Sequence, residues 1–341
     1  MGIAPSAPPA GSVAWQRDMQ DAFRTLGSLL DFLGLDPSRA PHSLDSDPAF
    51  PILVPRAFAG RMIPGDWNDP LLAQVLPLAR ENNEVPGFGA DAVGDLPAQI
   101  VPGLLHKYAS RALLMVSHQC AVHCRYCFRR EFPYGGLPRG RDGWERAWEY
   151  LAGARGVDEI VFSGGDPLFL DNRKLAGLLE RALALPHIRT LRFHTRLPVV
   201  LPSRIEAGLL DLLRQAAGRA ALIVVIHANH ARELGPECGG ALAALRSAGA
   251  LILNQAVLLR GINDDADSLA QLSRALISLG ALPYYLHRLD RVRGAAHFET
   301  DEARGLELIG ELRKRLPGYA VPRFVREDAG EPHKTPLDFG P

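Results

Sequence analysis

Three of the four cysteines in this chain of 341 residues lie within eight consecutive positions, as Cys120, Cys124 and Cys127. Their spacing, C-x3-C-x2-C, provides three thiolates, whereas an iron–sulfur cluster usually takes four. A [4Fe–4S] cluster held by three cysteines keeps one iron open for another ligand. The spacing therefore favours a cluster that binds and activates a second molecule.

Two other uses of clustered cysteines compete with this interpretation. A tetrahedral zinc site needs a fourth ligand, for which the sequence offers His118, His123 or Cys238. Disulfide bonds would leave one of the three clustered cysteines unpaired, and nothing else in the sequence indicates an oxidising compartment. Zinc is thus the main alternative to the cluster.

A glycine-rich string, Ser163-Gly164-Gly165-Asp166-Pro167-Leu168, ends a predicted strand. Glycines let a ligand approach the backbone closely, so exposed amides and carbonyls here could bind an ammonium or a carboxylate. Taken alone, the string favours an ordinary tight turn with Asp166 as a helix cap. Tyr126, directly before the third cysteine, either packs in the core or faces a ligand.

Several charged residues near these strings are candidates for binding ligands. Arg129 and Arg130 are costly to bury without anions, and a bound carboxylate or Glu131 could pair with them. Asp290 follows a predicted strand and either holds a cation or caps a turn.

For two lysines, Lys107 and Lys334, the ordinary expectation is exposure to solvent. Lys107 and Arg111 lie four positions apart, and on a helix or turn they could converge on a phosphate. Lys334 lies in a loop rich in glycine and proline. In a buried site a lysine of this kind could bind pyridoxal phosphate covalently.

The elements that must position these residues appear from about residue 110 onward. Short runs rich in Leu, Val and Ile alternate with helical patterns such as 172–185 and 267–279, as in parallel strands covered by helices. The predicted strands are 113–117, 159–163, 190–194, 221–227, 251–258, 282–287 and 321–326. Repeated βα units predict a parallel barrel, complete or partial, with its chemistry at the C-terminal ends of the strands.

The domain organisation follows from changes in composition. We expect a disordered tail over residues 1–12 and a mainly helical extension over 13–105, with one helical pattern over 15–35. Residues 106–341 would form the barrel and a C-terminal segment that carries Lys334. Net charge is zero, with Lys and Arg scattered, so no electrostatic case exists for nucleic acid or an anionic membrane. Without a signal peptide or a spanning apolar run, we expect a cytoplasmic enzyme.

Together these strings resemble the radical S-adenosylmethionine enzymes, and among them the lysine 2,3-aminomutases, which also use pyridoxal phosphate. The resemblance runs from about Trp15 to the end and is most specific at 118–132, 162–168, 258–264, 294–298 and 330–337. It is closest to the short bacterial branch that makes (R)-β-lysine for the modification of elongation factor P. The resemblance implies a partial parallel (βα) barrel of the radical S-adenosylmethionine type.

The resemblance also implies the cofactor sites. A [4Fe–4S] cluster on the three cysteines would bind S-adenosylmethionine, with its amino group near Gly164, Gly165 and Asp166 and its adenine near Tyr126. Lys334 matches the lysine that binds pyridoxal phosphate. Arg111 matches a phosphate-binding arginine, whereas Lys107 stands where longer relatives have arginine, which makes its phosphate role less certain.

For the substrate, the resemblance implies that Arg129 pairs with the carboxylate of L-lysine. Asp290 and Glu327 would hold the distal ammonium, although Glu327 is a glutamate where relatives have aspartate. The enzyme would be an isomerase that moves the amino group from C2 to C3. Its partners would be a cellular one-electron donor, elongation factor P and its lysyl ligase, and the formation of a homo-oligomer is left open.

The chain also departs from its longer relatives, which continue past the lysine with cysteines that bind zinc. Cys238 has no partner cysteine, so we expect no structural zinc. The remaining alternatives are free-lysine metabolism, an aminomutase for another amino acid, and a radical enzyme without pyridoxal. Asp290 and Glu327 argue against glutamate as the substrate.

Overall fold

An open sheet forms the framework of this computed structural model, which describes residues 14–138 and 142–338. Its ten strands lie side by side in chain order. Strands β3 to β9 run parallel, whereas β1, β2 and β10 are antiparallel to their neighbours. Within the described residues no pairing joins β10 to β1, so the sheet is a partial barrel, as expected. The strands are β1 (Gln99–Val101), β2 (Leu104–Tyr108), β3 (Arg111–Ser117), β4 (Glu159–Gly164), β5 (Thr190–Thr195), β6 (Ala221–Ile226), β7 (Ala250–Val257), β8 (Leu282–His287), β9 (Arg323–Arg326) and β10 (Thr335–Pro336).

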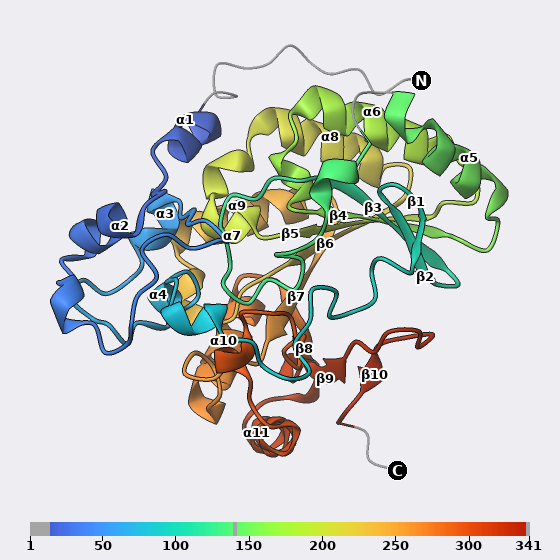
Figure 1. Cartoon of the computed structure of the whole chain (residues 1–341). Coiled ribbons are helices and arrows are strands. Elements are labelled where there is room, and N and C mark those ends of the chain that lie inside the picture. Colours follow the sequence, from blue (N-terminus) through green and yellow to red (C-terminus); the bar gives the residue numbers. More distant parts are fainter. Residues whose placement is uncertain (1–13, 139–141, 339–341) are drawn as a thin grey trace.

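Helices connect the parallel strands. Figure 1 shows α5, α6 and α8 along one side of the sheet, and α10 and α11 near β8 and β9. The connecting helices are α5 (Glu145–Gly153), α6 (Asn172–Leu183), α7 (Leu197–Val200), α8 (Ala207–Ala217), α9 (Pro236–Ser247), α10 (Ala266–Ser278) and α11 (Glu302–Arg315). Helix α6 illustrates why these segments are helical, because Asp171 caps its first turn and Leu175, Ala176, Leu179 and Ala182 form one buried face.

The predicted strands of the barrel are confirmed, each with boundaries within two residues of those observed. The prediction succeeds because the strands are rich in apolar residues, although only some, such as β4, are buried along their whole length, and β5 alternates between buried and half-buried positions. The predicted tail over 1–12 lies outside the described residues. Among the described residues, no helix is both long and apolar enough to cross a membrane.

The single helix predicted over 15–35 is wrong. The segment forms two helices, α1 (Ala14–Gln20) and α2 (Leu26–Leu33), separated by a bridge in which Phe23 and Val54 exchange backbone hydrogen bonds. Thr25 begins α2 in an extended conformation and accepts a hydrogen bond from Ser28 N. A long-range pairing and a local cap thus override the helical periodicity.

The N-terminal segment contains further short helices, as expected for a mainly helical extension, and a strand hairpin that the prediction did not include. Two short helices, α3 (Arg56–Ala59) and α4 (Pro70–Ala73), precede the antiparallel hairpin of β1 and β2. Lys107 lies in β2 and Arg111 begins β3, so the two residues flank the tight turn of a β-hairpin at residues 109 and 110 and do not share a helix. The predicted boundary between the N-terminal extension and the barrel, at residue 106, falls within strand β2. The division into these two regions stays a prediction. One continuous core includes apolar residues of both segments, such as Leu29 and Phe162.

Candidate functional site

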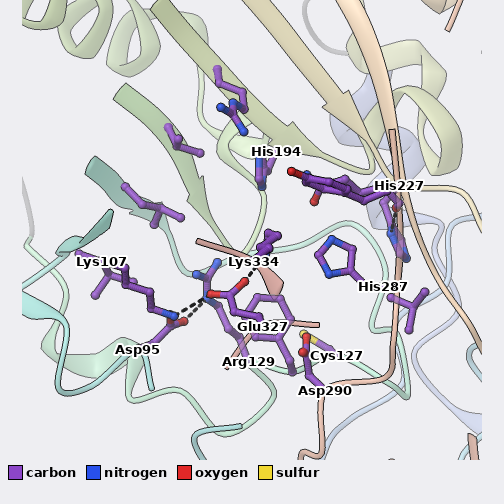
Figure 2. A pocket seen from close by; sticks show the side chains of 18 of the residues that line it. Asp95, Lys107, Cys127, Arg129, His194, His227, His287, Asp290, Glu327 and Lys334 are labelled. Atoms are coloured by element: carbon purple, nitrogen blue, oxygen red, sulfur yellow. Dashed lines mark hydrogen bonds and ion pairs between the residues drawn. The ribbon is translucent and has the colours of Figure 1, made fainter. Parts of the chain in front are cut away.

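A cavity of about 270 Å³ occupies the inner side of the partial barrel. Alternate residues of the strands face it, among them Arg192 and His194 of β5 and Tyr285 and His287 of β8. Loop residues close it, including Cys124, Tyr126, Cys127, Arg129, Asp290, Glu327 and Lys334. Figure 2 shows the charged side chains of these loops turned toward one another. The cavity thus brings together most of the candidate residues found in the sequence.

The glycine pair after β4 positions the chain that leads into the cysteines. Gly165 N donates to Ser117 O, and Asp166 N donates to Gln119 O, each over 2.7 Å. A Cβ atom on Gly164 would lie 2.3 Å from Ser117 O, and one on Gly165 would lie 2.4 Å from Gln119 O. These glycines therefore allow a close backbone contact immediately before Cys120.

The cysteine loop is also held from the N-terminal segment. Arg125, 1% exposed, forms a bidentate ion pair with Glu81, in which Nη2 and Oε2 are 2.6 Å apart. Arg130 donates to the same carboxylate over 2.9 Å. Arg130 therefore pairs with Glu81, and Glu131 pairs instead with Arg293. The N-terminal segment acts as a clamp on the loop.

The cysteine sulfurs lie in a partly buried environment. Burial, with neighbouring cysteines as a further cause, raises the pKa of Cys120 well above its usual range and that of Cys127 to about 11. Such thiols are neutral until a metal displaces their protons. Cys124 and Cys127 line the cavity, so a cluster held here would face its interior.

The observed side chains fit a cluster better than a single zinc ion. Among the described residues, no three His, Cys, Asp or Glu side chains converge as ligands of one metal ion. His123 Nδ1 donates to Pro51 O over 2.8 Å, and Cys238 lies fully buried in α9. A cluster spreads its thiolates over different irons and needs no such convergence.

Tyr126 is buried, and its hydroxyl is already engaged. It donates to Gln74 Oε1 over 2.9 Å, lies 2.8 Å from His227 Nε2, and accepts from Asn229 Nδ2 over 2.7 Å. Tyr126 still lines the cavity, and its engaged hydroxyl leaves the ring as the part available to a ligand. The predicted adenine contact stays a prediction.

Asp166 caps the turn after β4, as the interpretation of this string as an ordinary tight turn predicted. Its carboxylate accepts from Leu168 N over 3.0 Å, from Thr195 Oγ1 over 2.7 Å and from Arg196 N over 2.7 Å. Burial raises its pKa to about 6, against the effect of these donors. The carboxylate thus joins the ends of β4 and β5, and ligand contacts in this string would come from its backbone.

Lys334 reaches the cavity because of the hairpin at the end of the chain. Strand β10 returns antiparallel to β9 with Thr335 opposite Arg326, which places Lys334 beside Glu327. Lys334 Nζ forms an ion pair with Glu327 Oε2. Burial alone would raise the pKa of Glu327, but Lys334 and Lys107 hold it well below its usual range. The terminal lysine is therefore held inside the site, with an ionised partner.

Lys107 lines the cavity and joins two acids, and its phosphate role stays a prediction. Its Nζ lies 2.6 Å from Asp95 Oδ1 and 3.0 Å from Glu327 Oε1. Arg129 Nε lies 2.6 Å from the other oxygen of Asp95, and its Nη1 donates to Ser163 Oγ over 3.1 Å. We call the series Lys334, Glu327, Lys107, Asp95 and Arg129 the ion-pair chain (Figure 2).

Asp290 lines the same cavity without an ion-pair partner among the described residues. Burial and the nearby Glu327 raise its pKa to about 7, although Lys334 and Lys107 act in the opposite direction. A carboxyl group in this state can accept a cation that enters the cavity, because the cation would favour its ionised form.

The cavity also contains polar groups that lack a partner among the described residues. Arg111 lies over the ring of Tyr108, 4.2 Å from its centroid, and has no carboxylate partner among the described residues. By contrast, Arg192 pairs with Glu159. Three buried nitrogen atoms have no hydrogen-bond partner there, namely Nε2 of His194, Gln255 and His287. Such atoms indicate that the cavity accommodates a polar ligand.

Sequence reasoning missed several polar residues that organise the site. These residues are Gln74, Glu81, Asp95, Arg196 and Glu233, all of which are buried. None belongs to a motif that the sequence analysis singled out. Their only signal is that charged and amide side chains are rarely buried, which becomes visible once the fold is known.

The sequence of this chain is similar to those of known proteins. Residues 109–189 match the family described as "4Fe-4S single cluster domain". The chain is 44% identical to an L-lysine 2,3-aminomutase of Escherichia coli strain K12, over 95% of this chain and 94% of that relative. A second L-lysine 2,3-aminomutase, from Haemophilus influenzae, is 39% identical over 94% of both chains.

More distant similarities are also found. An L-lysine 2,3-aminomutase of Clostridium subterminale is 30% identical over 95% of this chain and 77% of its own length. Among solved structures, a radical SAM methyltransferase from Sphaerobacter thermophilus superposes with a TM-score of 0.44 at 22% identity. That superposition covers 65% of this chain and 68% of the methyltransferase.

Proposed function

The chain belongs to the L-lysine 2,3-aminomutase family, and from this premise we propose that it converts L-lysine to (R)-β-lysine. It would do so as a radical S-adenosylmethionine isomerase that uses pyridoxal phosphate. The observation that supports this most strongly is that Cys124, Cys127 and Lys334 line one cavity. The two cofactor sites would therefore act on the same substrate.

The residues present fit both cofactors. Cys120, Cys124 and Cys127 would hold the cluster, and Lys334 would bind the pyridoxal. When bound, the cluster with S-adenosylmethionine supplies a hydrogen-abstracting radical, and pyridoxal supplies a π-system that stabilises an unpaired electron on the substrate. Arg111 is available for the phosphate, since no carboxylate among the described residues pairs with it. The unpaired nitrogens of His194, Gln255 and His287 offer further polar contacts.

The substrate would be oriented through its two charged ends. Arg129, buried and already bonded to Ser163, would bind the carboxylate of lysine. Asp290 would hold the distal ammonium, with Glu327 as the second acid once Lys334 leaves it. Two anchors at opposite ends fix which carbon faces the cluster side of the cavity. A substrate without the distal charge would leave both acids without a cation and would be disfavoured.

Lysine binding would exchange partners within the ion-pair chain. In the structure, Glu327 neutralises Lys334, and Asp95 neutralises Arg129. The substrate ammonium can take the place of Lys334 beside Glu327, and the substrate carboxylate can share Arg129 with Asp95. Each entering charge thus meets a group that is already ionised and desolvated, which lowers the electrostatic cost of binding.

An anaerobic assay tests this proposal directly. Cluster-reconstituted protein is incubated with L-lysine, S-adenosylmethionine, pyridoxal phosphate and a one-electron reductant, and the products are resolved by chiral mass spectrometry. We expect (R)-β-lysine to form. Protein that carries both the cluster and pyridoxal but yields no β-lysine would contradict the proposal.

We further propose that the product serves the modification of elongation factor P by its lysyl ligase. The support is the 44% identity to the E. coli relative together with the strings shared with the short branch. Coupling the assay to purified elongation factor P and its ligase tests this step. Peptide fragmentation should identify β-lysine on the factor when the enzyme is present, and only α-lysine or no adduct when it is omitted. Equal β-lysine incorporation without the enzyme would contradict the role.

A further inference from the structure

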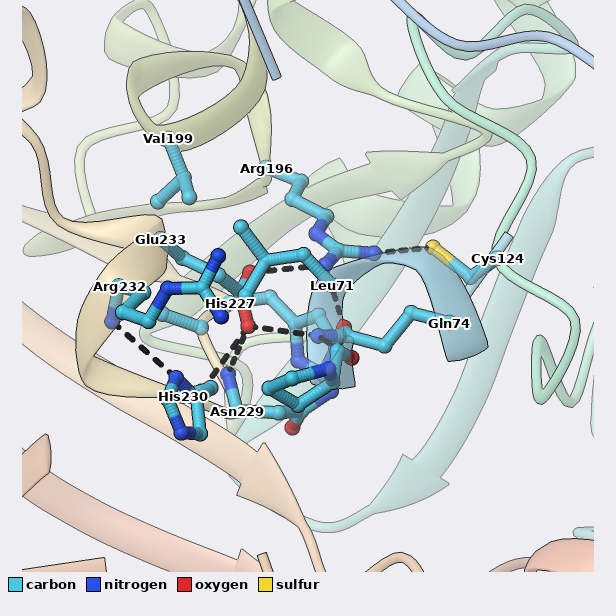
Figure 3. A network of polar contacts seen from close by, with 12 residues as sticks. Leu71, Gln74, Cys124, Arg196, Val199, His227, Asn229, His230, Arg232 and Glu233 are labelled. Carbon is cyan, nitrogen blue, oxygen red and sulfur yellow. Dashed lines mark hydrogen bonds and ion pairs between the residues drawn. The ribbon is translucent and has the colours of Figure 1, made fainter. Parts of the chain in front are cut away.

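A buried arginine contacts one of the three cysteines from behind the cavity. Arg196 Nη1 donates to Cys124 Sγ over 2.7 Å, as Figure 3 shows. The side chain is 7% exposed and does not line the cavity. Of the three cysteines, Cys124 is the one whose sulfur accepts a side-chain hydrogen bond from the described residues.

The backbone of Arg196 is fixed independently of this contact. Arg196 lies between β5 and α7, where Asp166 accepts a hydrogen bond from its N–H group over 2.7 Å. Thr195 bonds to the same carboxylate. The guanidinium lies over the ring of Phe58, 5.2 Å from its centroid, which restricts it from another side. The donor is thus held in place before any cluster binds.

A buried carboxylate balances the charge of this guanidinium. Glu233 is fully buried, and its Oε2 lies 2.8 Å from Arg196 Nη2. Its Oε1 accepts from Asn229 N over 2.8 Å, from His230 N over 2.9 Å and from Gln74 Nε2 over 3.0 Å. Glu233 therefore remains a fixed anion on the far side of the arginine from the sulfur.

Gln74 completes the network around these charges. Its Oε1 accepts from Arg196 Nη2 over 2.7 Å and from Tyr126 Oη over 2.9 Å. Two residues of the cysteine loop, Cys124 and Tyr126, are thereby tied to one fully buried amide. We call Gln74, Arg196, Asn229 and Glu233 the cysteine network.

Hydrogen bonds to the sulfurs and nearby charges set the reduction potential of an iron–sulfur cluster. Reduction by one electron adds negative charge to the cluster and its thiolates. A cationic donor on one thiolate stabilises that reduced form, and an anion behind the donor weakens the effect. We propose that Arg196 is a positioning residue that raises the reduction potential of the cluster through Cys124, to an extent that Glu233 limits.

This inference rests on the proposed function only in requiring a cluster on Cys124. It makes no use of lysine, pyridoxal or turnover. The measurement is therefore the midpoint potential of the cluster in the full-length protein, followed by electron paramagnetic resonance during a redox titration without substrate. Iron content is determined on the same samples.

Two substitutions should move this potential in opposite directions. Arg196→Gln removes the cation, so we expect an equilibrium constant for reduction about tenfold lower, which for one electron is a shift of about 59 mV to more negative potential. Glu233→Gln removes the balancing anion and should shift the potential to more positive values. Arg232→Gln is the matched control, because Arg232 lies beside the network but pairs with Asp69. The reduction potential of the cluster in this control variant should equal that in the wild type.

The double variant Arg196→Gln/Glu233→Gln is the control for misfolding of the single variants. It removes both charges of the buried pair, so neither is left without its partner. Its potential should lie below that of the wild type, since the donor to Cys124 is absent. Unshifted potentials at full iron content, or shifts of both single variants in the same direction, would overturn the inference. Wild-type protein that assembles no cluster would instead contradict the proposed function.

Discussion

The cysteine network and the ion-pair chain are both buried groups of charges, but their partners differ in kind. In the network, Arg196 and Glu233 are 7% and 0% exposed and are completed by side-chain amides and backbone N–H groups. In the chain, Lys107, Glu327 and Lys334 are each 16% exposed and are paired mainly with one another. Except for Arg196 Nε, which has no hydrogen-bond partner, the charged groups of the network are paired by the fold, whereas the chain contains the groups expected to bind ligands.

This difference suggests two ways of preparing a site. The cysteine network fixes positions that should not change during a reaction, since removing any member leaves a buried polar group unpaired. The ion-pair chain holds reactive and binding groups ionised until a ligand of like charge replaces one of them. Substitutions should therefore affect stability and cluster properties in the first region, and substrate and pyridoxal binding in the second.

The largest effect is expected at Lys334. Lys334→Ala should lower kcat by more than about a thousandfold, because no other group would bind pyridoxal covalently. Borohydride reduction followed by peptide mapping should find a pyridoxyl group on the peptide of residue 334 in the wild type alone. Lys174→Ala is the control, since that lysine is 63% exposed. A variant that retains activity would remove the main distinction between the two regions.

Glu81→Gln, which alters the carboxylate that holds the cysteine loop, should cause a large loss of stability. This change leaves Arg125 and Arg130 without their shared anion in a buried position, which should cost about 3 kcal/mol of unfolding free energy. Denaturant unfolding of the cluster-free protein measures it. Glu145→Gln, which breaks a half-exposed pair with Arg181, should cost less than about 1 kcal/mol. Equal losses of unfolding free energy in the two variants would mean that the buried ion pairs of Glu81 stabilise the protein no more than a surface ion pair does.

Arg129→Lys tests the end of the ion-pair chain that faces the substrate carboxylate. Lysine keeps the charge but loses the planar fork that contacts both Asp95 and Ser163, so kcat/KM for L-lysine should fall about a hundredfold. Steady-state kinetics at fixed cluster content measures this. The same change at Arg293, which pairs with Glu131 at the surface, should have no effect. An unchanged KM and kcat would exclude Arg129 from substrate binding.

The smallest effect is a pH dependence at Asp290. Its pKa is raised to about 7, so the carboxylate becomes ionised as pH rises from 6 to 8, while the lysine ammonium stays protonated. KM for lysine should therefore fall about tenfold over this range. Asp290→Asn should flatten the profile. A wild-type KM that rises with pH would contradict the assignment.

The raised pKa of Asp290 has an opposite consequence for stability. The folded protein binds this proton more tightly than the unfolded chain does, whose carboxyl has the usual pKa of 3.8. The contribution of Asp290 to stability is therefore complete below that value and declines as pH rises toward about 7. Unfolding experiments comparing wild type with Asp290→Asn across this window should show the difference.

The sequence by itself determined the features that depend on residues close to one another along the chain. The cysteine spacing indicates a cluster without reference to distant residues, and short runs rich in apolar residues locate the strands because most of these side chains are buried in the core. Lys334 was found through a resemblance in its own string, and the hairpin of β9 and β10 then accounts for its contact with Glu327.

Only the tertiary structure decided how the charges pair. Lys107 and Glu327 are separated by 220 positions, and Gln74 and Glu233 by 159, so no local pattern relates them. The helical periodicity over 15–35 likewise gave no sign that Phe23 would pair with Val54. Ion pairs and bridges of this kind form because folding removes charged and polar groups from water together, and their partners are those that the fold brings within reach.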